Sequence, residues 1–458
     1  MGQKPSRSTF RQRLDEMVSV LREEIVTGKR EVGEYLPSEV ALGEQFNLSK
    51  NSVRKGLERL VSENLIIKVP RIGNQVARPE QEGRTTIRFG YYKSVIEEAA
   101  LDELLAEFEK EHPHIRVQLI PLPYDNYGET ISEYMERELL DAATVNNNDF
   151  QSFLGLGHSD LLEPLGDKPE LYPFLSDAFR HGERLLGHPL IFSPVVLCYN
   201  RDHFKNSAMA EPDSSWKWND LIRVAEELTD DNHYGFYYHL LSNNRWPIFM
   251  LQSGMKLERN EAGKVRLYRT KLMDGMRVCR DMIARKDILP SYMSECDHDA
   301  EELFQQGKVS MIMATYFSLN YLRNSEFEYD VAPLPYLEHA TTLLLAIGVM
   351  INRKSKCKEA ARTFLDFLLS YKSQLLIRQR TLSIPAHKQA AEWTGSDSMN
   401  RPSRFFMYRE IIPSFRYISE LNIKPHQIDV IRNEMKLYWS GMEDEQAVCS
   451  RLEQLLSE

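Results

Sequence analysis

Residues 47–66, NLSKNSVRKGLERLVSENLI, constrain the local fold more than any other stretch of the chain. Apolar side chains recur there at the spacing of one helical face, at Leu48, Val53, Leu57, Leu60 and Val61. Most side chains between them are polar and able to donate hydrogen bonds. The pattern predicts an amphipathic helix that buries one face and presents hydrogen-bond donors on the other.

The segments around this helix predict a small unit of helices followed by a hairpin. A helical stripe covers residues 10–27, a short helix covers residues 39–45, and a third helix begins after Ser49. Ser38 and Ser49 are suited to cap the second and third helices. Two short strands follow in LIIKV and NQVA, joined by PRIG. Two short helices that cross at a turn and precede a two-stranded wing predict a winged helix-turn-helix.

The charge of the chain is unevenly distributed. Residues 1–84 hold 15 Lys and Arg residues and 12 Asp and Glu residues, a net charge of +3. The whole chain holds 57 and 67, so residues 85–458 hold 42 and 55, a net charge of −13. An acidic surface repels nucleic acid, so we expect any contact with phosphates to be concentrated in the N-terminal part.

Several motifs in residues 10–78 match a known DNA-binding unit. They are LPSE at residues 36–39, LSKNSVRKGLERL at residues 48–60, LI at residues 65–66, and the wing glycine Gly73. On these motifs the segment resembles the DNA-binding domain of the GntR family of bacterial transcription regulators. Two positions depart from the family: Val40 stands where an arginine usually helps hold the phosphate backbone, and Gln75 replaces the second wing glycine.

The resemblance implies that the helix beginning at Ser49 enters the major groove of DNA. Arg54 is the expected base reader, because its planar fork matches O6 and N7 of guanine. Asn51 is expected to read adenine or to bind phosphate. The alternative for each side chain is a solvated surface without a DNA contact.

Other residues of the same unit are expected to position it on DNA. Phosphate contacts are expected from Lys50, Ser52 and Lys55, and Arg71 is expected to reach the minor groove or the backbone from the wing. With the helix-start serines and the wing glycine, the expected DNA-binding residues are Ser38, Ser49, Lys50, Asn51, Ser52, Arg54, Lys55, Arg71 and Gly73.

A polar stretch separates this head from a larger body. We expect a head at residues 1–78, a linker at residues 79–86, which has no apolar face, and a body at residues 87–458. In the body, TIRFGYY predicts a strand, residues 97–110 a helix, and HPHIRVQLIPL a second strand. This alternation recurs and predicts an α/β fold with a parallel sheet. GHPLIFSPVVLCYN predicts a pair of strands.

Motifs of catalysis and cofactor binding are absent from the sequence. There is no G-x-x-x-x-G-K-[ST], no G-x-S-x-G and no H-E-x-x-H, and GLGHSD has only two of the three glycines of a dinucleotide loop. The five cysteines are odd in number, far apart and form no C-x-x-C pair, as is typical of reduced structural thiols. ECDHD is expected to be a solvated loop or a helix start. We therefore expect no enzyme, no metal and no cofactor.

Several segments of the body follow the order and spacing of a known group. They are GHPLIFSPVVLCYNRDHF, SWKWNDLIRVAEEL, ELFQQGKVSMIMA, YDVAPLP, AIGVMINRKSKCKEAARTFLDFLLS and IPAHK. On these segments the body resembles the extracellular solute-binding proteins of sugar transporters, the maltose-binding-like group. AATVNNNDFQSF and TTLLLA depart from that group, which usually has an apolar-Pro-Asp-apolar segment and a glycine-rich loop there.

The second resemblance implies a multidomain chain: a winged helix-turn-helix followed by a two-lobed α/β fold like that of periplasmic binding proteins (type II). Lobe 1 is expected at about residues 87–194 and 337–384, and lobe 2 at about residues 195–336 and 385–458. Three chain crossings between the lobes are expected near Ser193, Pro335 and Pro385, where they act as hinges.

The same resemblance suggests candidate ligand contacts, because sugar rings stack on aromatic faces while amides and carboxylates hold hydroxyl groups. The candidates are Tyr92, Asn147, Asp149, Trp246, Tyr316 and Phe317. Asn147 and Asp149 are expected in a loop, and Trp246 at the start of a helix that faces the cleft. The alternative for each aromatic residue is core packing.

Together these features favour a transcription regulator that binds double-stranded DNA as a homodimer and senses a small solute. The resemblance implies that this solute is a sugar or oligosaccharide. The alternative is a solute-binding receptor of a carbohydrate transporter with an atypical N-terminus. The N-terminal residues lack the apolar stretch of a secretory signal, which favours a cytoplasmic protein. No stretch is apolar over the roughly 20 residues of a membrane span, so no membrane association is expected.

Overall fold

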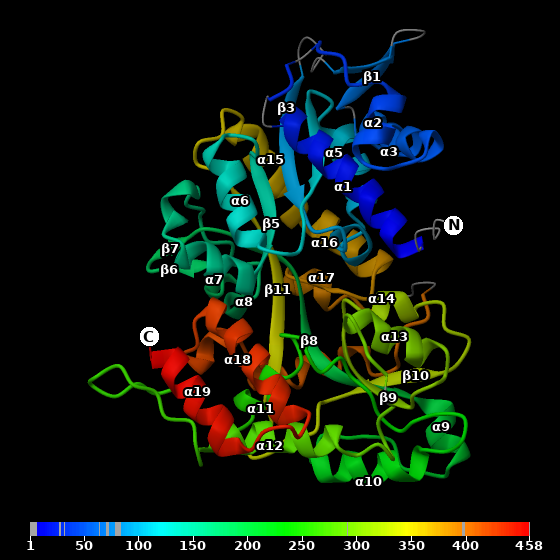
Figure 1. The fold of residues 1–458 in the computed structure, drawn as a ribbon, viewed down its shortest axis with the longest axis vertical. Helices are drawn as coiled ribbons and strands as arrows, with labels where there is room; N and C mark the ends of the chain where they lie inside the picture. Colours follow the sequence, from blue (N-terminus) through cyan, green and yellow to red (C-terminus); the bar gives the residue numbers. More distant parts are fainter. Residues whose placement is uncertain are drawn as a thin grey trace.

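A computed structural model describes residues 7–26, 29–31, 33–63, 65–69, 73–77, 84–290, 292–395 and 399–457. These residues form a small head, residues 7–77, and a body of two lobes (Figure 1). The head, drawn in blue, lies beside the upper lobe in the figure, lobe 1. The lower lobe, lobe 2, contains the C-terminal helices. The winged helix-turn-helix and the two-lobed α/β body are both confirmed.

The head contains the helices and the wing that its sequence predicts. Its elements are α1 (Arg7–Val26), α2 (Glu39–Gln45), α3 (Lys50–Ser62), β1 (Ile66–Val69) and β2 (Gly73–Val76). The two strands are antiparallel, with Ile66 opposite Val76. Val53, Leu57 and Leu60 of α3 are buried in one apolar cluster with residues of α1 and of the wing. The apolar spacing of residues 47–66 therefore marks the inner face of α3.

A mixed sheet forms the centre of the body, in the order β10-β8-β11-β5-β3-β4, with β9 and β12 also paired to β8 and β13 paired to β11. Its strands are β3 (Thr85–Tyr91), β4 (Ile115–Pro121), β5 (Ala142–Asn146), β8 (His188–Asn200), β9 (Met311–Thr315), β10 (Tyr329–Ala332), β11 (Thr342–Ile351), β12 (Ile384–Pro385) and β13 (Phe415–Arg416). Strand β3 is parallel to β4 and β5, as predicted, but β8 and β11 are antiparallel to each other. The prediction of a parallel sheet fails for these two because the chain leaves lobe 1 along β8 and returns along β11.

Helices cover the sheet in both lobes (Figure 1). Lobe 1 contains α4 (Val95–Glu98), α5 (Leu101–Glu111), α6 (Tyr127–Glu136), α7 (Asn147–Gly155), η1 (His158–Leu161), α8 (Pro173–Asp177), α15 (Lys358–Leu369), α16 (Tyr371–Arg380), α17 (Lys388–Ala391) and the hairpin of β6 (Arg180–His181) and β7 (Arg184–Leu185). Lobe 2 and the crossings contain α9 (Arg201–Asn206), α10 (Trp218–Leu228), α11 (Pro247–Leu251), α12 (Lys271–Ile283), α13 (Asp297–Gln305), α14 (Leu319–Leu322), η2 (Phe405–Arg409), η3 (Ile412–Ser414), η4 (Ile418–Leu421), α18 (Pro425–Trp439) and α19 (Glu445–Ser457). None of the described helices has the length and apolar character needed to span a membrane.

Strand β8 is one continuous element of 13 buried residues, where the sequence predicted a pair of strands. Its residues 188–194 pair with β11, and its residues 195–200 pair with β9 and β10. Pro194, which has no backbone N–H to donate, lies where β8 changes neighbours, so the sheet tolerates it there. Close to Ser193 the chain thus passes from one half of the sheet to the other along an unbroken strand.

The other two crossings lie later in the chain than predicted. Strand β11 begins at Thr342, whose hydroxyl donates to the carbonyl of Val195 at 2.5 Å, so the second crossing is there rather than near Pro335. Strand β12 pairs Ile384 and Pro385 with the lobe 1 half of β8, and α17 follows it. The third crossing therefore follows α17 instead of lying near Pro385.

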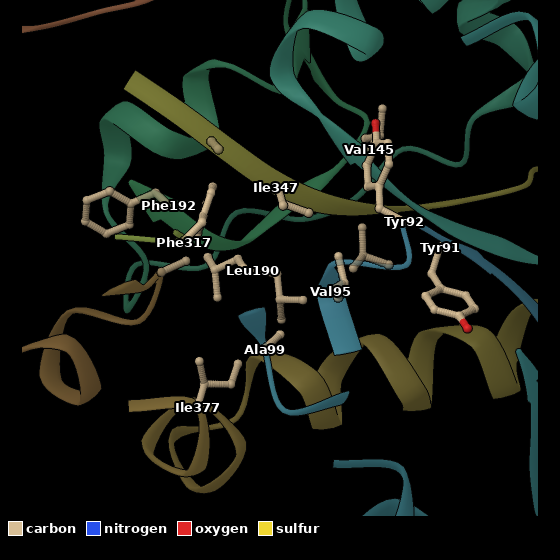
Figure 2. Packing of buried hydrophobic residues seen from close by; sticks show 14 of the residues in the cluster. Tyr91, Tyr92, Val95, Ala99, Val145, Leu190, Phe192, Phe317, Ile347 and Ile377 are labelled. Carbon is tan, nitrogen blue, oxygen red and sulfur yellow. The ribbon is translucent and has the colours of Figure 1, made fainter. Parts of the chain in front are cut away.

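The lobes share an apolar core across the first crossing. Residues 195–199 of β8 alternate between two clusters, as the pleat of a strand requires. Val196 and Cys198 face the cluster that continues into lobe 1. Figure 2 shows part of that cluster, with Phe317, which follows β9 of lobe 2, near Phe192 of β8. The crossing is therefore packed as well as hydrogen-bonded.

The close approach of α3 to α1 at Gly56 yields a test of the head. A Cβ atom there would clash with Met17 Cε and lie 3.1 Å from methyl carbons of Leu14 and Val18. We expect Gly56→Ala to destabilise the head by about 1–3 kcal/mol, because side chains of α1 must move. Thermal unfolding followed by circular dichroism measures this change. The matched control is Gly155→Ala, where a Cβ meets no atom within 4 Å; equal destabilisation in both variants would contradict the expectation.

Candidate functional site

The exposed face of α3 carries four of the nine predicted DNA-binding residues. Lys50, Asn51, Arg54 and Lys55 are all exposed, whereas Ser52 is 5% exposed. The start of the helix is fixed by Ser49, whose hydroxyl accepts a hydrogen bond from the backbone N–H of Ser52 at 3.3 Å. The fold thus presents the first turns of α3 to solvent with their donors outward, the arrangement that a recognition helix requires.

The predicted serines have structural partners within the head. The hydroxyl groups of Ser49 and Ser52 lie 2.6 Å apart, so each satisfies the other inside the cap of α3. Ser38 caps α2, because its hydroxyl accepts from the backbone N–H of Ala41 at 3.2 Å. Their capping roles follow from these distances, while their contacts with phosphate stay predictions.

Arg54 is held by a carboxylate from the preceding helix. Its Nε and Nη2 donate to the two oxygens of Glu39 at 3.2 and 3.0 Å, although the two residues are 15 positions apart. Hydrogen bonding to Arg54 is the main cause of a lowered pKa for Glu39. The positive charges of Arg54, Lys50 and Lys68 lower this pKa further, by smaller amounts. Glu39 raises the pKa of Arg54 in turn. Glu39 is not among the DNA-binding residues predicted from the sequence, although it lies within LPSE.

The wing and the second helix complete this surface. Gly73 begins β2 with a φ of +152°, a conformation that side chains rarely adopt, so a glycine is favoured at this turn of the wing. Val40, at the position where the resemblance implies an arginine, is 58% exposed and cannot hold a phosphate. Arg71 lies outside the described residues, and its contact stays a prediction.

A second candidate site lies between the lobes, in two adjoining cavities beside α7. The first, of about 200 Å³, is lined by Asn148, Asp149, Gln151, Ser152, Asn243, Ile418, Ser419, Ile423, Pro425, Ile428 and Asp429. The second, of about 150 Å³, is lined by Asn147, Gln151, Asp177, Ala178, Tyr417 and Ser419. Amides, carboxylates and hydroxyl groups dominate the lobe 1 wall, and isoleucines form part of the lobe 2 wall. The combination suits a small ligand with several hydroxyl groups.

The lobe 1 wall is the first turn of α7 rather than the expected loop. Asn146 caps this helix by accepting from the N–H of Asp149 at 2.8 Å. Oδ2 of Asp149 accepts from the hydroxyl of Tyr92 at 2.5 Å and from Nδ2 of Asn146 at 2.7 Å. Burial raises the pKa of Asp149, and these two hydrogen bonds oppose that shift. Tyr92, itself 3% exposed, therefore orients Asp149 rather than lining the cavity.

The lobe 2 wall is held by a network around Asn243. Its Nδ2 donates to Asp429 at 3.0 Å, and its Oδ1 accepts from Arg432 at 3.3 Å. Trp246 lies behind it, because its Nε1 also donates to Oδ1 of Asn243 at 3.3 Å, while its ring packs 5.9 Å from that of Trp439. Trp246 is fully buried, so it supports Asn243 and does not face the cavity.

The structure brings the predicted ligand residues together only in part. Asn147 and Asp149 line the cavities, and Tyr92 contacts Asp149. Tyr316 is fully buried, with its hydroxyl donating to the carbonyl of Phe405 at 2.8 Å, and Phe317 is 8% exposed; neither lines these two cavities. Sequence reasoning did not find Gln151, Asn243 or Asp429, because isolated polar residues carry no periodic or motif signal.

Comparisons with known families divide the chain at the same place as the structure. Residues 103–405 match the family described as bacterial extracellular solute-binding protein. Residues 15–76 match the family described as bacterial regulatory proteins, gntR family. The first match covers most of the two-lobed body, and the second covers most of the head.

Individual relatives show the same division. A putative binding protein of Brucella abortus is 21% identical over 359 residues, which cover 76% of this chain and 86% of that protein. The uncharacterized HTH-type transcriptional regulator YieP of Escherichia coli is 39% identical over 56 residues, which cover 12% of this chain and 24% of that protein. The chain is thus similar to binding proteins over its body and to a regulator over its head.

Solved structures share the fold of the body. An ABC substrate-binding protein of Listeria monocytogenes in complex with cycloalternan has a TM-score of 0.68 and 19% identity, covering 81% of this chain and 98% of that chain. Maltose-bound MalE3 of T. maritima has a TM-score of 0.69 and 17% identity, with the same coverage. At these identities the likeness concerns the fold.

The geometry of Arg54 and Glu39 predicts how base preference responds to mutation. We expect Arg54→Ala to relax the preference at one base pair per half-site, at a cost of about 1–3 kcal/mol, because the guanidinium fork is lost. Glu39→Gln should relax the preference at the same base pair, because the amide holds the guanidinium of Arg54 in place less firmly than the carboxylate does. Selection of bound duplexes from a random library, followed by affinity measurements, provides the test. Lys55→Ala is the control, expected to weaken binding uniformly; an equal effect of Arg54→Ala on selected and random DNA would make Arg54 a phosphate contact.

The network around Asn243 predicts a loss of solute affinity on mutation. Asn243→Ala should weaken binding of any solute held in the first cavity by about 1–2 kcal/mol, because a polar group of the lobe 2 wall is removed. The matched control is Asn244→Ala, since Asn244 does not line either cavity. Isothermal titration calorimetry with the sugar that most raises the melting temperature measures both. Similar losses in the two variants would place the solute elsewhere.

Proposed function

Because the chain belongs to the bacterial extracellular solute-binding protein family and carries a gntR-family DNA-binding domain at its N-terminus, we propose that it is a transcription regulator controlled by a small carbohydrate. The carbohydrate binds between the lobes and changes the affinity of the head for operator DNA. The observation that carries this proposal is the presence, in one chain, of an exposed recognition helix and a polar cavity between two hinged lobes. The protein would act in the cytoplasm, where its operator is.

The head supports the DNA-binding half of the proposal. The exposed turn of α3 presents Lys50, Asn51 and Arg54, and the body carries most of the negative charge of the chain. Phosphates are therefore attracted to the head and repelled by the body. One short recognition helix buries too little surface for operator-level affinity, so we propose a homodimer on a two-fold operator, with half-sites about 34 Å apart.

The cavities support a carbohydrate as the effector. Asn148, Asp149 and Gln151 face Asn243 across the gap between the lobes, and planar amides and carboxylates bind hydroxyl groups from two sides. Two solved proteins with this fold have cycloalternan and maltose bound, respectively. These two cavities do not present a set of aromatic faces on which sugar rings stack, because Tyr417 is the one aromatic residue that lines either of them.

The head can respond to the lobes because it lies on lobe 1. Figure 1 shows the head beside lobe 1, and within the head Arg22 of α1 forms a two-fold hydrogen-bonded ion pair with Glu63 at the end of α3, at 2.9 and 2.7 Å. Burial raises the pKa of Tyr91 of lobe 1, and the carboxylates of Asp102 and Glu63 raise it further, so the end of α3 lies near this strand. Closure of the cleft would therefore rotate lobe 2 relative to a joined head and lobe 1. In a dimer, such a rotation changes the spacing of the two recognition helices.

Reciprocal coupling is the direct test of this proposal. If solute binding changes operator affinity, operator DNA must change solute affinity by the same factor, which is roughly 5- to 150-fold for couplings of about 1–3 kcal/mol. A thermal-shift screen of mono- and oligosaccharides on the full-length protein first identifies the solute, because a ligand of the folded state raises the melting temperature.

Calorimetry with and without the selected operator then measures the coupling. Solute could release the protein from DNA or recruit it, and both outcomes satisfy the expectation. Identical solute affinity in the two titrations would show that the body does not regulate the head. Asn243→Ala serves as the control, since it should weaken solute binding without changing operator affinity in the absence of solute.

A further inference from the structure

A third cavity of the body shares η4 as a wall with the two cavities beside α7. Its volume is about 320 Å³, and it has no lining residue in common with the other two. This volume falls within the range of sites for small ligands. Its walls come from three segments: the end of α11 with the turn after it, the residues just before β11, and β13 with η4.

The cavity adjoins the second crossing between the lobes. Arg416 of β13, which lines the cavity, pairs with Leu343 of β11. Gln252, which follows α11 and is fully buried, donates to the carbonyls of Pro335 and Thr341 at 2.9 and 3.0 Å. The walls are therefore held by strand pairing and by a buried amide, so this cavity is a built part of the fold.

Positive groups dominate the cavity, although the body has a net charge of −13. Among the described residues that line it, Lys256, Arg416 and the titratable ring of His339 stand against one carboxylate, that of Glu420. The side chains of Lys256 and His339 make no hydrogen bond or ion pair with the described part of the chain. Arg416 donates from Nη1 to two nearby carbonyls, and its Nε lies 3.6 Å from Glu420, which leaves the donors of Nη2 for a ligand.

These groups suit a phosphate. The hydroxyl of Thr341, a residue that is 8% exposed, also has no hydrogen-bond partner within the described residues. An ammonium, a guanidinium fork and a hydroxyl together offer donors to the several oxygens of a phosphate, and two cations balance its charge. A neutral sugar would leave these charges without a counter-charge, so the cavity differs in chemistry from the amide-lined cavities beside α7.

Both cations are anchored to the ends of η4. Arg416 stands two positions before its first residue, Ile418. Lys256 precedes Leu257, whose backbone N–H donates to the carbonyl of Leu421, the last residue of η4, at 2.8 Å. Ile418 lines the first cavity beside α7. A ligand held by Lys256 and Arg416 together would therefore fix both ends of a helix that forms part of the lobe 2 wall.

We propose that this cavity binds the phosphate group of a small molecule, and that the bound phosphate clamps η4 and strengthens solute binding between the lobes. Fixing η4 in advance lowers the conformational entropy that solute binding otherwise costs, so the two ligands favour each other. The phosphate site depends only on this cavity, whereas its effect on the solute rests on the proposed function.

Calorimetric titration of the full-length protein with inorganic phosphate and with glycerol 3-phosphate tests the site. Lys256→Ala should weaken binding of both probes by about 5-fold, as expected for an exposed charge-assisted contact. Thr341→Val keeps the shape of the side chain and should also weaken binding, because it removes the hydroxyl. Lys264→Ala is the matched control, since Lys264 is an exposed lysine of lobe 2 that lines none of the three cavities. Equal affinities in the two lysine variants, or no phosphate binding by the wild type, would overturn the proposal.

The basic head also attracts phosphate, so the location of the bound ion needs a separate measurement. Hydrogen–deuterium exchange read by mass spectrometry should slow, on addition of inorganic phosphate, in peptides that cover residues 251–257, 336–342 and 416–422. Slower exchange confined to residues 47–62 would place the phosphate on the head and overturn the proposal. Neither measurement uses sugar or operator, so a failure here leaves the proposed function untouched, and a failure to bind sugar or DNA leaves the phosphate site untouched.

The clamping role has its own test. Saturating inorganic phosphate should increase the affinity for the sugar selected by the thermal-shift screen by roughly 5- to 150-fold, the usual range of such couplings. Lys256→Ala should lose this increase while its sugar affinity without phosphate stays at the wild-type value. An unchanged sugar affinity with phosphate bound would overturn the clamping of η4.

Discussion

The continuity of β8 through both lobes is the constraint on which the rest of the body depends. This strand pairs with β11 and β12 in lobe 1 and with β9 and β10 in lobe 2, so each half of the sheet needs it. Val196 and Cys198 belong to the apolar cluster that continues through the same point. An unbroken, packed strand cannot let the lobes separate, so their relative movement must be a rotation about the crossings.

The walls of the candidate cleft are built on these crossings. Asn147, at the start of α7, accepts a hydrogen bond from the backbone N–H of Ala346 in β11 at 3.0 Å, which ties the lobe 1 wall to a strand that connects the lobes. The lobe 2 wall includes residues of η4 and α18, which follow β13 next to the start of β11. A solute that contacts both walls gains contacts only when the lobes are together, and it therefore shifts the population toward the closed form.

The head and the body carry net charges of opposite sign. The head is basic and presents Arg54 in a fork held by Glu39, whereas the body is acidic. A carboxylate on a surface that faces phosphates is unfavourable unless it serves a partner, and Glu39 serves Arg54. One physical rule, the cost of an uncompensated charge, thus accounts for the pairing of Glu39 with Arg54.

The sequence by itself determined the elements and the two-part plan. The apolar spacing of residues 47–66 predicted α3, and Ser49 predicted its first turn. Asn147 and Asp149 were predicted as ligand contacts from the family resemblance, in a segment that the structure shows to be the start of α7. Tertiary structure alone decided that Trp246 and Tyr316 are buried, because their cover comes from residues 439 and 405, far along the chain. It also decided that Asn243 faces Asp149 and that β8 is continuous through Pro194. Local spacing records which side of an element is apolar, but which polar groups meet depends on how distant elements pack, and no local pattern encodes that.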